Sequence, residues 1–218
     1  MSKLEKKSKE APGKAEPKGR LVALEGSRGS ALLLEAQRLA RLCRGKSEPA
    51  FSRWDASGTF YELRISKPKI RTLALTPRTL VLLYASDLLF RLRWEIEPTM
   101  KEGRTVVVAP YVETAIAFGM ATGLPKEWLK ELFAFAPKAD ATLRLKEKKK
   151  DKGKAKDKKA DRAMAGFAEF CCSSLAKDHP DWDLADLRGG MLNYLAGLEG
   201  EDEIRRLGKK LPKALRKA

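Results

Sequence analysis

The sequence predicts an α/β fold in which helices flank a parallel β-sheet. An apolar run at residues 21–24 and a β-branched run at 105–109 each suit a strand that is covered on both faces. Segments of helical length follow both runs, and strand and helix alternate through most of the chain. A chain of 218 residues with 43% apolar residues can bury one substantial core, so its length allows one domain or at most two.

The first strand leads into a glycine-containing turn and then into an amphipathic helix that reaches Cys43. The turn brings two glycines and two hydroxyl groups to a helix start, where backbone N–H groups without a helical partner can hold an anion. This is the outline of a phosphate-binding loop. Its candidate residues are Gly26, Ser27, Arg28, Gly29 and Ser30.

The chemical groups of an active phosphate loop are missing from this turn. Such loops read G-x-x-x-x-G-K-[ST], where the lysine reaches phosphate and the hydroxyl holds Mg²⁺. Counting from Gly26, the second glycine falls at Ala31, the lysine at Leu32 and the hydroxyl at Leu33. We therefore expect the strand, turn and helix of such a loop without its catalytic groups. The alternative is that residues 31–33 simply start a helix that packs on the core.

The next segments continue the alternation. Ala50–Ser52 is predicted to be a short strand, and residues 53–59 place a cation, a carboxylate, a glycine and hydroxyls after it. Ligands of open α/β sheets bind at such strand ends, although an ordinary polar loop is an equal alternative. Thr76 and Pro77 form a helix start, as N-cap and first helical residue. That helix should run to residue 100, bend near Pro98 and close at residues 102–103.

The rest of the chain is predicted to contain three further strands and four further helices. We expect strands at residues 105–109, 139–145 and 191–196, and helices at 112–122, 125–135, 163–177 and 202–217. The cysteines Cys43, Cys171 and Cys172 are odd in number and lack metal-ligand spacing, so neither a disulfide framework nor a metal site is expected. The adjacent cysteine pair is interpreted as buried small residues of a helix, with a redox sensor as the alternative.

The net charge of +16 is concentrated in three segments. Residues 1–20 hold seven basic and three acidic residues, residues 146–162 hold ten and four, and residues 205–218 hold seven and none. The rest of the chain is near neutral. The first two segments are lysine-rich and poor in apolar residues, which is typical of disorder. They could bind nucleic acid through counterion release, or could serve only to keep the protein in solution.

The segments TPRTLVLLYASDLLFRLRWEIEPTMKEGRTVVVAPYVETAIAFGMATGL and PKADATLRL resemble the middle of thymidylate kinase, the P-loop kinase family that phosphorylates dTMP. That family shows F-A-A-D-R in a long helix, V-V-x-D-R-Y at a strand end, S-x-x-A-Y-Q on the next helix, and P-D-x-T-x-x-L before the lid. The resemblance covers residues 20–146 in matching order and implies a P-loop NTPase-type fold.

The resemblance also implies the position of a nucleoside pocket. Tyr84 stands where the family's phenylalanine stacks on thymine, Phe118 keeps an aromatic residue, and Gly119 replaces the family's glutamine. Asp87 matches the family's aspartate, but Leu88 replaces the arginine after it. The implied remnant of the pocket consists of Arg53, Tyr84, Tyr111, Thr114 and Phe118.

The same comparison implies the loss of most phosphate-handling groups. Ala109 and Pro110 replace an aspartate of the Mg²⁺ site and an arginine that binds the dTMP phosphate. The family places arginines in its lid or phosphate loop, whereas residues 146–162 of this chain are mainly lysines, which lack the bidentate fork of arginine. Arg28 and Arg162 are the remaining candidates for that role. For Arg28, a surface residue of a turn is the alternative.

From these observations we expect a thymidylate-kinase-like domain at residues 20–217, a disordered tail at 1–19, and a lysine-rich segment in place of the lid. We expect the protein to have a catalytically inactive kinase fold, with no catalytic residue and no metal ligand. Its expected role is in binding or regulation. One alternative is a divergent dTMP kinase, which would use ATP and Mg²⁺. Another is a basic nucleic-acid-associated adaptor. The expected partners are a weakly bound nucleoside or nucleotide, nucleic acid through the basic segments, and a second copy in a homodimer. The expected location is cytoplasmic, without a membrane segment.

Overall fold

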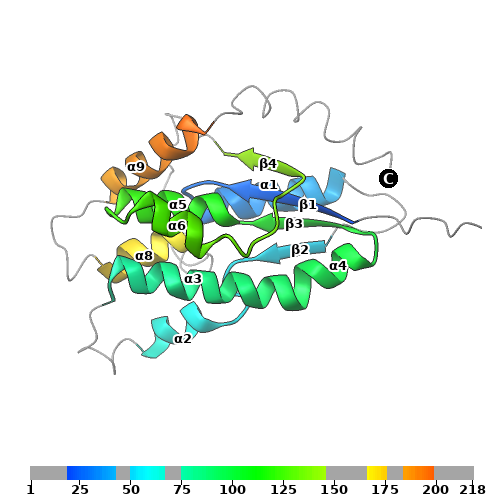
Figure 1. Cartoon of the computed structure of the whole chain (residues 1–218), viewed down its shortest axis with the longest axis horizontal. Coiled ribbons are helices and arrows are strands. Elements are labelled where there is room, and N and C mark those ends of the chain that lie inside the picture. The colour runs from blue at the N-terminus through cyan, green and yellow to red at the C-terminus, as the bar shows by residue number, and fades with distance from the viewer. Residues whose placement is uncertain (1–18, 43–49, 67–74, 146–165, 176–183, 199–218) are drawn as a thin grey trace, which may run out of the picture.

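The computed structural model describes residues 19–42, 50–66, 75–145, 166–175 and 184–198, and every structural statement below concerns these ranges. Four strands form one parallel sheet with the order β2, β3, β1, β4 (Figure 1). The strands are β1 (Arg20–Glu25), β2 (Ala50–Arg53), β3 (Thr105–Ala109) and β4 (Ala141–Arg144). The predicted α/β fold with a parallel sheet and flanking helices is confirmed.

The two central strands explain why the sequence reads as continuous apolar runs. Leu21 pairs in register with Val106, and Val22 with Val107. Successive side chains of a strand point to opposite faces, so each central strand must satisfy two cores. Val22, Leu24, Val107 and Ala109 belong to one buried cluster, and Leu21, Ala23, Val106 and Val108 belong to the other.

Helix α1 (Gly29–Leu42) covers one face of the sheet through Leu32, Ala36 and Leu39. The other face carries the larger core, to which α3, α5, α6, α8 and α9 contribute (Figure 1). These elements are α3 (Pro77–Arg91), α5 (Val112–Ala121), α6 (Lys126–Leu132), α8 (Phe167–Leu175) and α9 (Leu184–Gly197). A further short helix, α2 (Thr59–Ser66), precedes α3 and was not anticipated.

The long helix predicted to end at residue 100 is present, with an irregular last third. Thr76 caps α3, and its hydroxyl accepts the N–H of Thr79 at 3.1 Å. The helical path continues through a π-helical turn, η1 (Leu92–Ile96), into α4 (Glu97–Lys101). Pro98 cannot donate a backbone hydrogen bond, and just before it the N–H of Glu97 bonds to the carbonyl of Leu92, five residues back. The expected bend at the proline therefore takes the form of a widened turn.

The predicted strand at residues 191–196 is wrong, because these residues lie inside α9. Leu187, Met191 and Leu195 are the buried apolar residues of this helix, and their spacing of four places them on one helical face. A Cβ atom at Gly190 would lie 3.1 Å from the Cβ of Ala121, so α9 packs closely on α5. The helix predicted at 125–135 is also shorter than expected and ends at Leu132.

Several predictions fall outside the described residues. The tail at 1–18, the lysine-rich segment from residue 146, Cys43, Arg162 and the helix at 202–217 belong to this group, so the proposed domain limits stay predictions. Cys171 is described and lies buried on α8, as expected for a small helical residue. Of the helices that the structure describes, none combines the length and the hydrophobicity that crossing a bilayer demands.

Candidate functional site

The phosphate-loop remnant has the expected strand, turn and helix. Strand β1 ends at Glu25, Gly26 and Ser27 are buried in the turn, and α1 begins at Gly29. Arg28 and Ser30 are half-buried. The structure thus brings these residues together at the carboxyl edge of the sheet, where ligands of α/β folds bind.

Glu25 is a buried carboxylate that sequence reasoning did not single out. It accepts the N–H of Glu113 at 2.9 Å and both the N–H and the hydroxyl of Thr114, at 2.9 and 2.5 Å. Burial raises the pKa of Glu25 to about 7, the nearby carboxylate of Glu113 adds to the increase, and the hydrogen bonds from α5 oppose it. The oxygen of Thr114 also accepts the N–H of Gly26 at 3.1 Å. Thr114 therefore ties the turn to the start of α5.

The place where a phosphate loop needs charge is apolar in this structure. Leu32, at the lysine position of the motif, is 3% exposed and belongs to the same buried cluster as Ala109, at the strand-end position. A Cβ atom at Gly26 would lie 3.4 Å from Leu32 Cδ2, so Leu32 packs directly under the turn. The side chains at these two positions are therefore filling the core beneath α1.

Four of the five predicted pocket residues lie in the interior. Tyr84, Tyr111, Thr114 and Phe118 are at most 4% exposed, whereas Arg53 is exposed at the end of β2. The Tyr84 hydroxyl donates to the carbonyl of Tyr111 at 2.7 Å, and burial raises the pKa of both phenols. The structure thus brings Tyr84 and Tyr111 into contact and leaves Arg53 apart on the surface.

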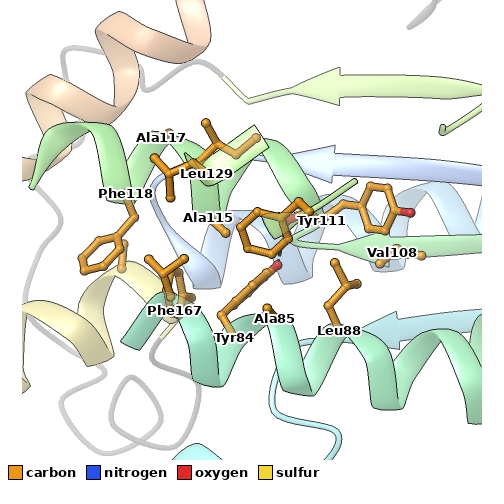
Figure 2. Close-up of a cluster of buried hydrophobic side chains, with 14 of the residues drawn as sticks. Tyr84, Ala85, Leu88, Val108, Tyr111, Ala115, Ala117, Phe118, Leu129 and Phe167 are labelled. Atoms are coloured by element: carbon orange, nitrogen blue, oxygen red, sulfur yellow. Dashed lines mark hydrogen bonds between the residues drawn. The ribbon is translucent and has the colours of Figure 1, made fainter. Parts of the chain in front are cut away.

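Phe167 of α8 lies against the two aromatic residues expected to face a base. Its ring centroid is 4.5 Å from that of Tyr84 and 5.1 Å from that of Phe118 (Figure 2). Phe167 is itself 1% exposed. Tyr84 and Phe118 are themselves 0% exposed, so a planar ligand could reach either ring only if buried neighbours such as Phe167 moved. Sequence reasoning did not connect Phe167 with the pocket.

Close packing also occupies the position of the glutamine in the family's helix motif. A Cβ atom at Gly119 would lie 2.6 and 2.8 Å from the two methyl groups of Leu129 on α6. Real Cβ atoms do not approach this closely. Because Gly119 has no side chain, α6 can pack closely on α5. Leu129 is fully buried.

Asp87 joins α3 to the loop after β2 and forms a buried ion pair with Arg91 of the same helix. The carboxylate of Asp87 accepts the N–H groups of Asp55 at 3.0 Å and Ser57 at 2.9 Å, and its Oδ2 lies 3.0 Å from Arg91 Nε. That Nε–H is close to the carboxylate without being well directed at it, so the contact is an ion pair more than a hydrogen bond. Arg91 also donates to the Pro110 carbonyl at 2.9 Å and to the Tyr84 hydroxyl at 3.2 Å.

The α1 N-terminus already holds an anion from within the chain. Glu169 of α8 accepts the N–H of Gly29, with its two carboxylate oxygens 3.2 and 3.4 Å from the amide nitrogen. Arg188 of α9 lies 3.4 Å from the same carboxylate. Within the described residues no cluster of three or more potential ligands could hold a metal ion.

No family model matches the chain. It is 29% identical over 129 residues to "Probable thymidylate kinase 2" of Saccharolobus solfataricus, which covers 59% of this chain and 60% of that protein. It is 34% identical over 142 residues to a "Thymidylate kinase" of Xanthomonas oryzae pv. oryzae, covering 59% of this chain and 56% of that protein. A "Probable thymidylate kinase" of Pyrobaculum aerophilum is 36% identical over 69 residues, or 32% of this chain and 36% of that protein. These comparisons support a place for the chain in the thymidylate kinase family.

The alignments span between about one third and three fifths of these relatives' lengths. For a thymidylate kinase relative, the changes noted above have a clear structural setting. Leu88, which replaces the arginine of the family's helix motif, is fully buried. Arg91 lies on the same helix one turn after Asp87, and the i,i+4 spacing of these two residues is the one signal in the sequence that could have revealed the pair. No comparable local signal marks Phe167 or Glu169.

Proposed function

We propose that this thymidylate kinase relative is a non-catalytic member of the family, a pseudo-enzyme that serves a binding or regulatory role. The observation that carries the proposal is the burial of Leu32 and Ala109 in one apolar cluster beneath α1. These are the positions at which the family motif requires a lysine and a carboxylate.

Phosphoryl transfer depends almost entirely on positioning and on charge stabilisation. In this chain, core residues stand where the family motif has its lysine and its carboxylate. Loss of a single preorganised donor lowers a rate by roughly 10²–10³-fold, and here a cation and a metal ligand are both missing from their motif positions, Leu32 and Ala109. Leu32 also packs against the turn at Gly26. Its side chain therefore fills the space in which a cation from solution could otherwise replace the lysine. These facts support a protein that does not transfer phosphate.

The test is a phosphotransfer assay of the purified chain with ATP, dTMP and Mg²⁺. We expect no dTDP above the background of a reaction without protein. The variant Leu32→Lys should be equally inactive, because the catalytic groups act as a unit, and Leu32→Met serves as its matched control for packing. Magnesium-dependent turnover by the wild-type chain at ordinary kinase rates, roughly 1–100 s⁻¹, would favour the divergent dTMP kinase instead.

A second candidate function, association with nucleic acid, is favoured by the charge distribution. The near-neutral remainder of the chain contrasts with the basic segments at 1–20, 146–162 and 205–218. Binding through them should lack sequence preference and weaken by several powers of ten between about 50 and 200 mM salt if six or more phosphates are contacted. Fluorescence anisotropy with labelled DNA and RNA would show this, and deletion of residues 1–19 should reduce the salt slope. Full affinity after deletion and after shortening of 146–160 would place the site elsewhere.

The other partner expectations also stay predictions. A nucleoside held through its base would need Phe167 to leave Tyr84 and Phe118. A homodimer has a candidate surface in the exposed apolar residues of α3 and η1, which are Leu82, Leu89, Phe90 and Trp94. Light scattering after gel filtration would distinguish monomer from dimer. The cytoplasmic location is likewise proposed, and fluorescence microscopy of the tagged full chain would test it.

A further inference from the structure

Two side chains of α8 occupy the two halves of the site remnant. Glu169 reaches the α1 N-terminus, and Phe167 reaches the aromatic rings of α3 and α5. A carboxylate at a helix N-terminus satisfies the same backbone N–H groups and the same positive end of the helix dipole that would attract a phosphate. The Phe167 ring meets the Tyr84 ring at 51° and the Phe118 ring at 70°, so it fills the space beside both rings through tilted and edge-on contacts.

The docking of α8 is tight at the backbone as well. A Cβ atom at Gly166 would lie 2.4 Å from the Cα and 2.6 Å from the N of Gly29, so a glycine backbone at the foot of α8 sits directly on the first residue of α1. Ala168, Phe170 and Cys171 are buried in the same core as Phe167. Helix α8 is therefore held by buried apolar side chains and by the hydrogen bond from the Gly29 N–H to the Glu169 carboxylate.

We propose that α8 is an internal occupant of both parts of the site remnant, an autoinhibitory contact in which Glu169 stands in for a phosphate at the loop and Phe167 fills the nucleoside pocket. The inference rests on the proposed function and deepens it, because it says why the retained loop does not take up an external anion. A ligand can bind only in molecules in which α8 has moved. A site open in about 0.1% of molecules binds about a thousandfold more weakly than the same site held open.

The Glu169 half of the contact makes the proposal testable with pyrophosphate as the probe. The full-length variant Glu169→Gln removes the negative charge at Gly29 while keeping the side-chain shape. Glu127→Gln, at an exposed position of α6, is the matched control, because it makes the same change in net charge away from the site. Affinities would be measured by titration calorimetry without Mg²⁺ at constant ionic strength, together with the amide resonance of Gly29.

We expect Glu169→Gln to bind pyrophosphate at least tenfold more tightly than the wild type, with a saturable shift of the Gly29 resonance. The wild type and Glu127→Gln should show neither. Equal affinity in all three proteins, or the same gain in Glu127→Gln, would overturn the proposal and assign the binding to the lysine-rich segments. Tight wild-type binding that shifts Gly29 would overturn it as well.

A measurement on the wild type covers the case in which Glu169→Gln does not fold. Hydrogen exchange of α8 would be followed at pyrophosphate concentrations up to those that shift the Gly29 resonance. At pyrophosphate concentrations high enough to occupy Gly29 in the wild type, the proposal expects α8 to exchange faster. Occupancy of Gly29 with α8 fully protected would overturn it. These binding results are separate from the phosphotransfer assay, so failure of one conclusion is distinguishable from failure of the other.

Discussion

The Asp87–Arg91 pair and the phosphate-loop remnant lie in the core of the same domain but differ in their buried side chains. The first region has ionisable residues, and the second has apolar residues where the family motif has charges. Asp87 and Arg91 are fully buried, while Leu32 stands at the lysine position of the loop motif and Ala109 at the aspartate position that ends β3. This difference can be explained by where the groups that neutralise each buried charge come from. Asp87 is bound by two backbone N–H groups and by Arg91, all from this chain.

The lysine and the metal-binding carboxylate of an active loop depend on a partner from outside, namely phosphate and Mg²⁺. A buried charge that lacks its partner costs several kcal/mol, whereas a buried leucine stabilises the core. Apolar residues are therefore favoured at such positions wherever no ligand supplies the partner. Charges whose partners are internal are kept, because losing one partner strands the other.

The largest effect should come from stranding Arg91. The substitution Asp87→Asn leaves a buried guanidinium without its counter-charge, so the free energy of unfolding should fall by about 3–5 kcal/mol. Urea denaturation followed by circular dichroism measures this. Adding Arg91→Met to Asp87→Asn should cost much less than the sum of the two single changes. Additive effects would mean that the pair is not coupled.

A change in pH should produce the next largest effect, through Glu25. Its pKa is about 7 in the folded protein against a usual 4.5, so the folded state binds a proton more tightly than the unfolded state. Its contribution to stability is therefore fully present below pH 4.5 and is lost as pH rises towards 7, by up to about 3 kcal/mol. The difference in unfolding free energy between wild type and Glu25→Gln, measured from pH 5 to 8, isolates this slope. Parallel curves would contradict the assignment.

The smallest effect concerns the glycine under α6. Gly119→Ala places a methyl group on Leu129 and should cost about 1–2 kcal/mol through overpacking. Gly189 on α9 is the matched control, because a Cβ atom there meets nothing within 4 Å, and Gly189→Ala should stabilise by about 0.5–1 kcal/mol. Thermal denaturation measures both changes. If both glycines responded alike, close packing at Gly119 would not be the reason for its lack of a side chain.

Sequence reasoning was successful where local chemistry determines structure. The β-branched run at 105–109 became β3, and Thr76 and Pro77 start α3 because a hydroxyl cap and a fixed φ favour a helix start. It failed at residues 191–196, where the pair Gly189 and Gly190 weakens the helical signal and packing on α5 restores the helix.

The candidate site was predictable only in part, for a similar reason. The strand, turn and helix around Gly26 and the loss of charge at Leu32 can be read from motif spacing. The contact between Glu169 and Gly29 joins residues 140 positions apart, and no local pattern encodes it. The π-helical turn before Pro98 was also missed, because a missing N–H predicts a disturbance of the helix without specifying its form.

The central position of β1 has a consequence for synthesis on the ribosome. Leu21 pairs with Val106, and Val22 also pairs with Ala141, so the first strand of the chain finds no sheet neighbour until most of the domain has emerged. At translation rates of about 5–20 residues per second, the apolar segment 21–24 would wait on the order of 10 s. During that time its unpaired edges could join another chain. Yield in the cell should therefore depend on chaperones that shield the nascent N-terminal segment more than on the stability of the finished fold.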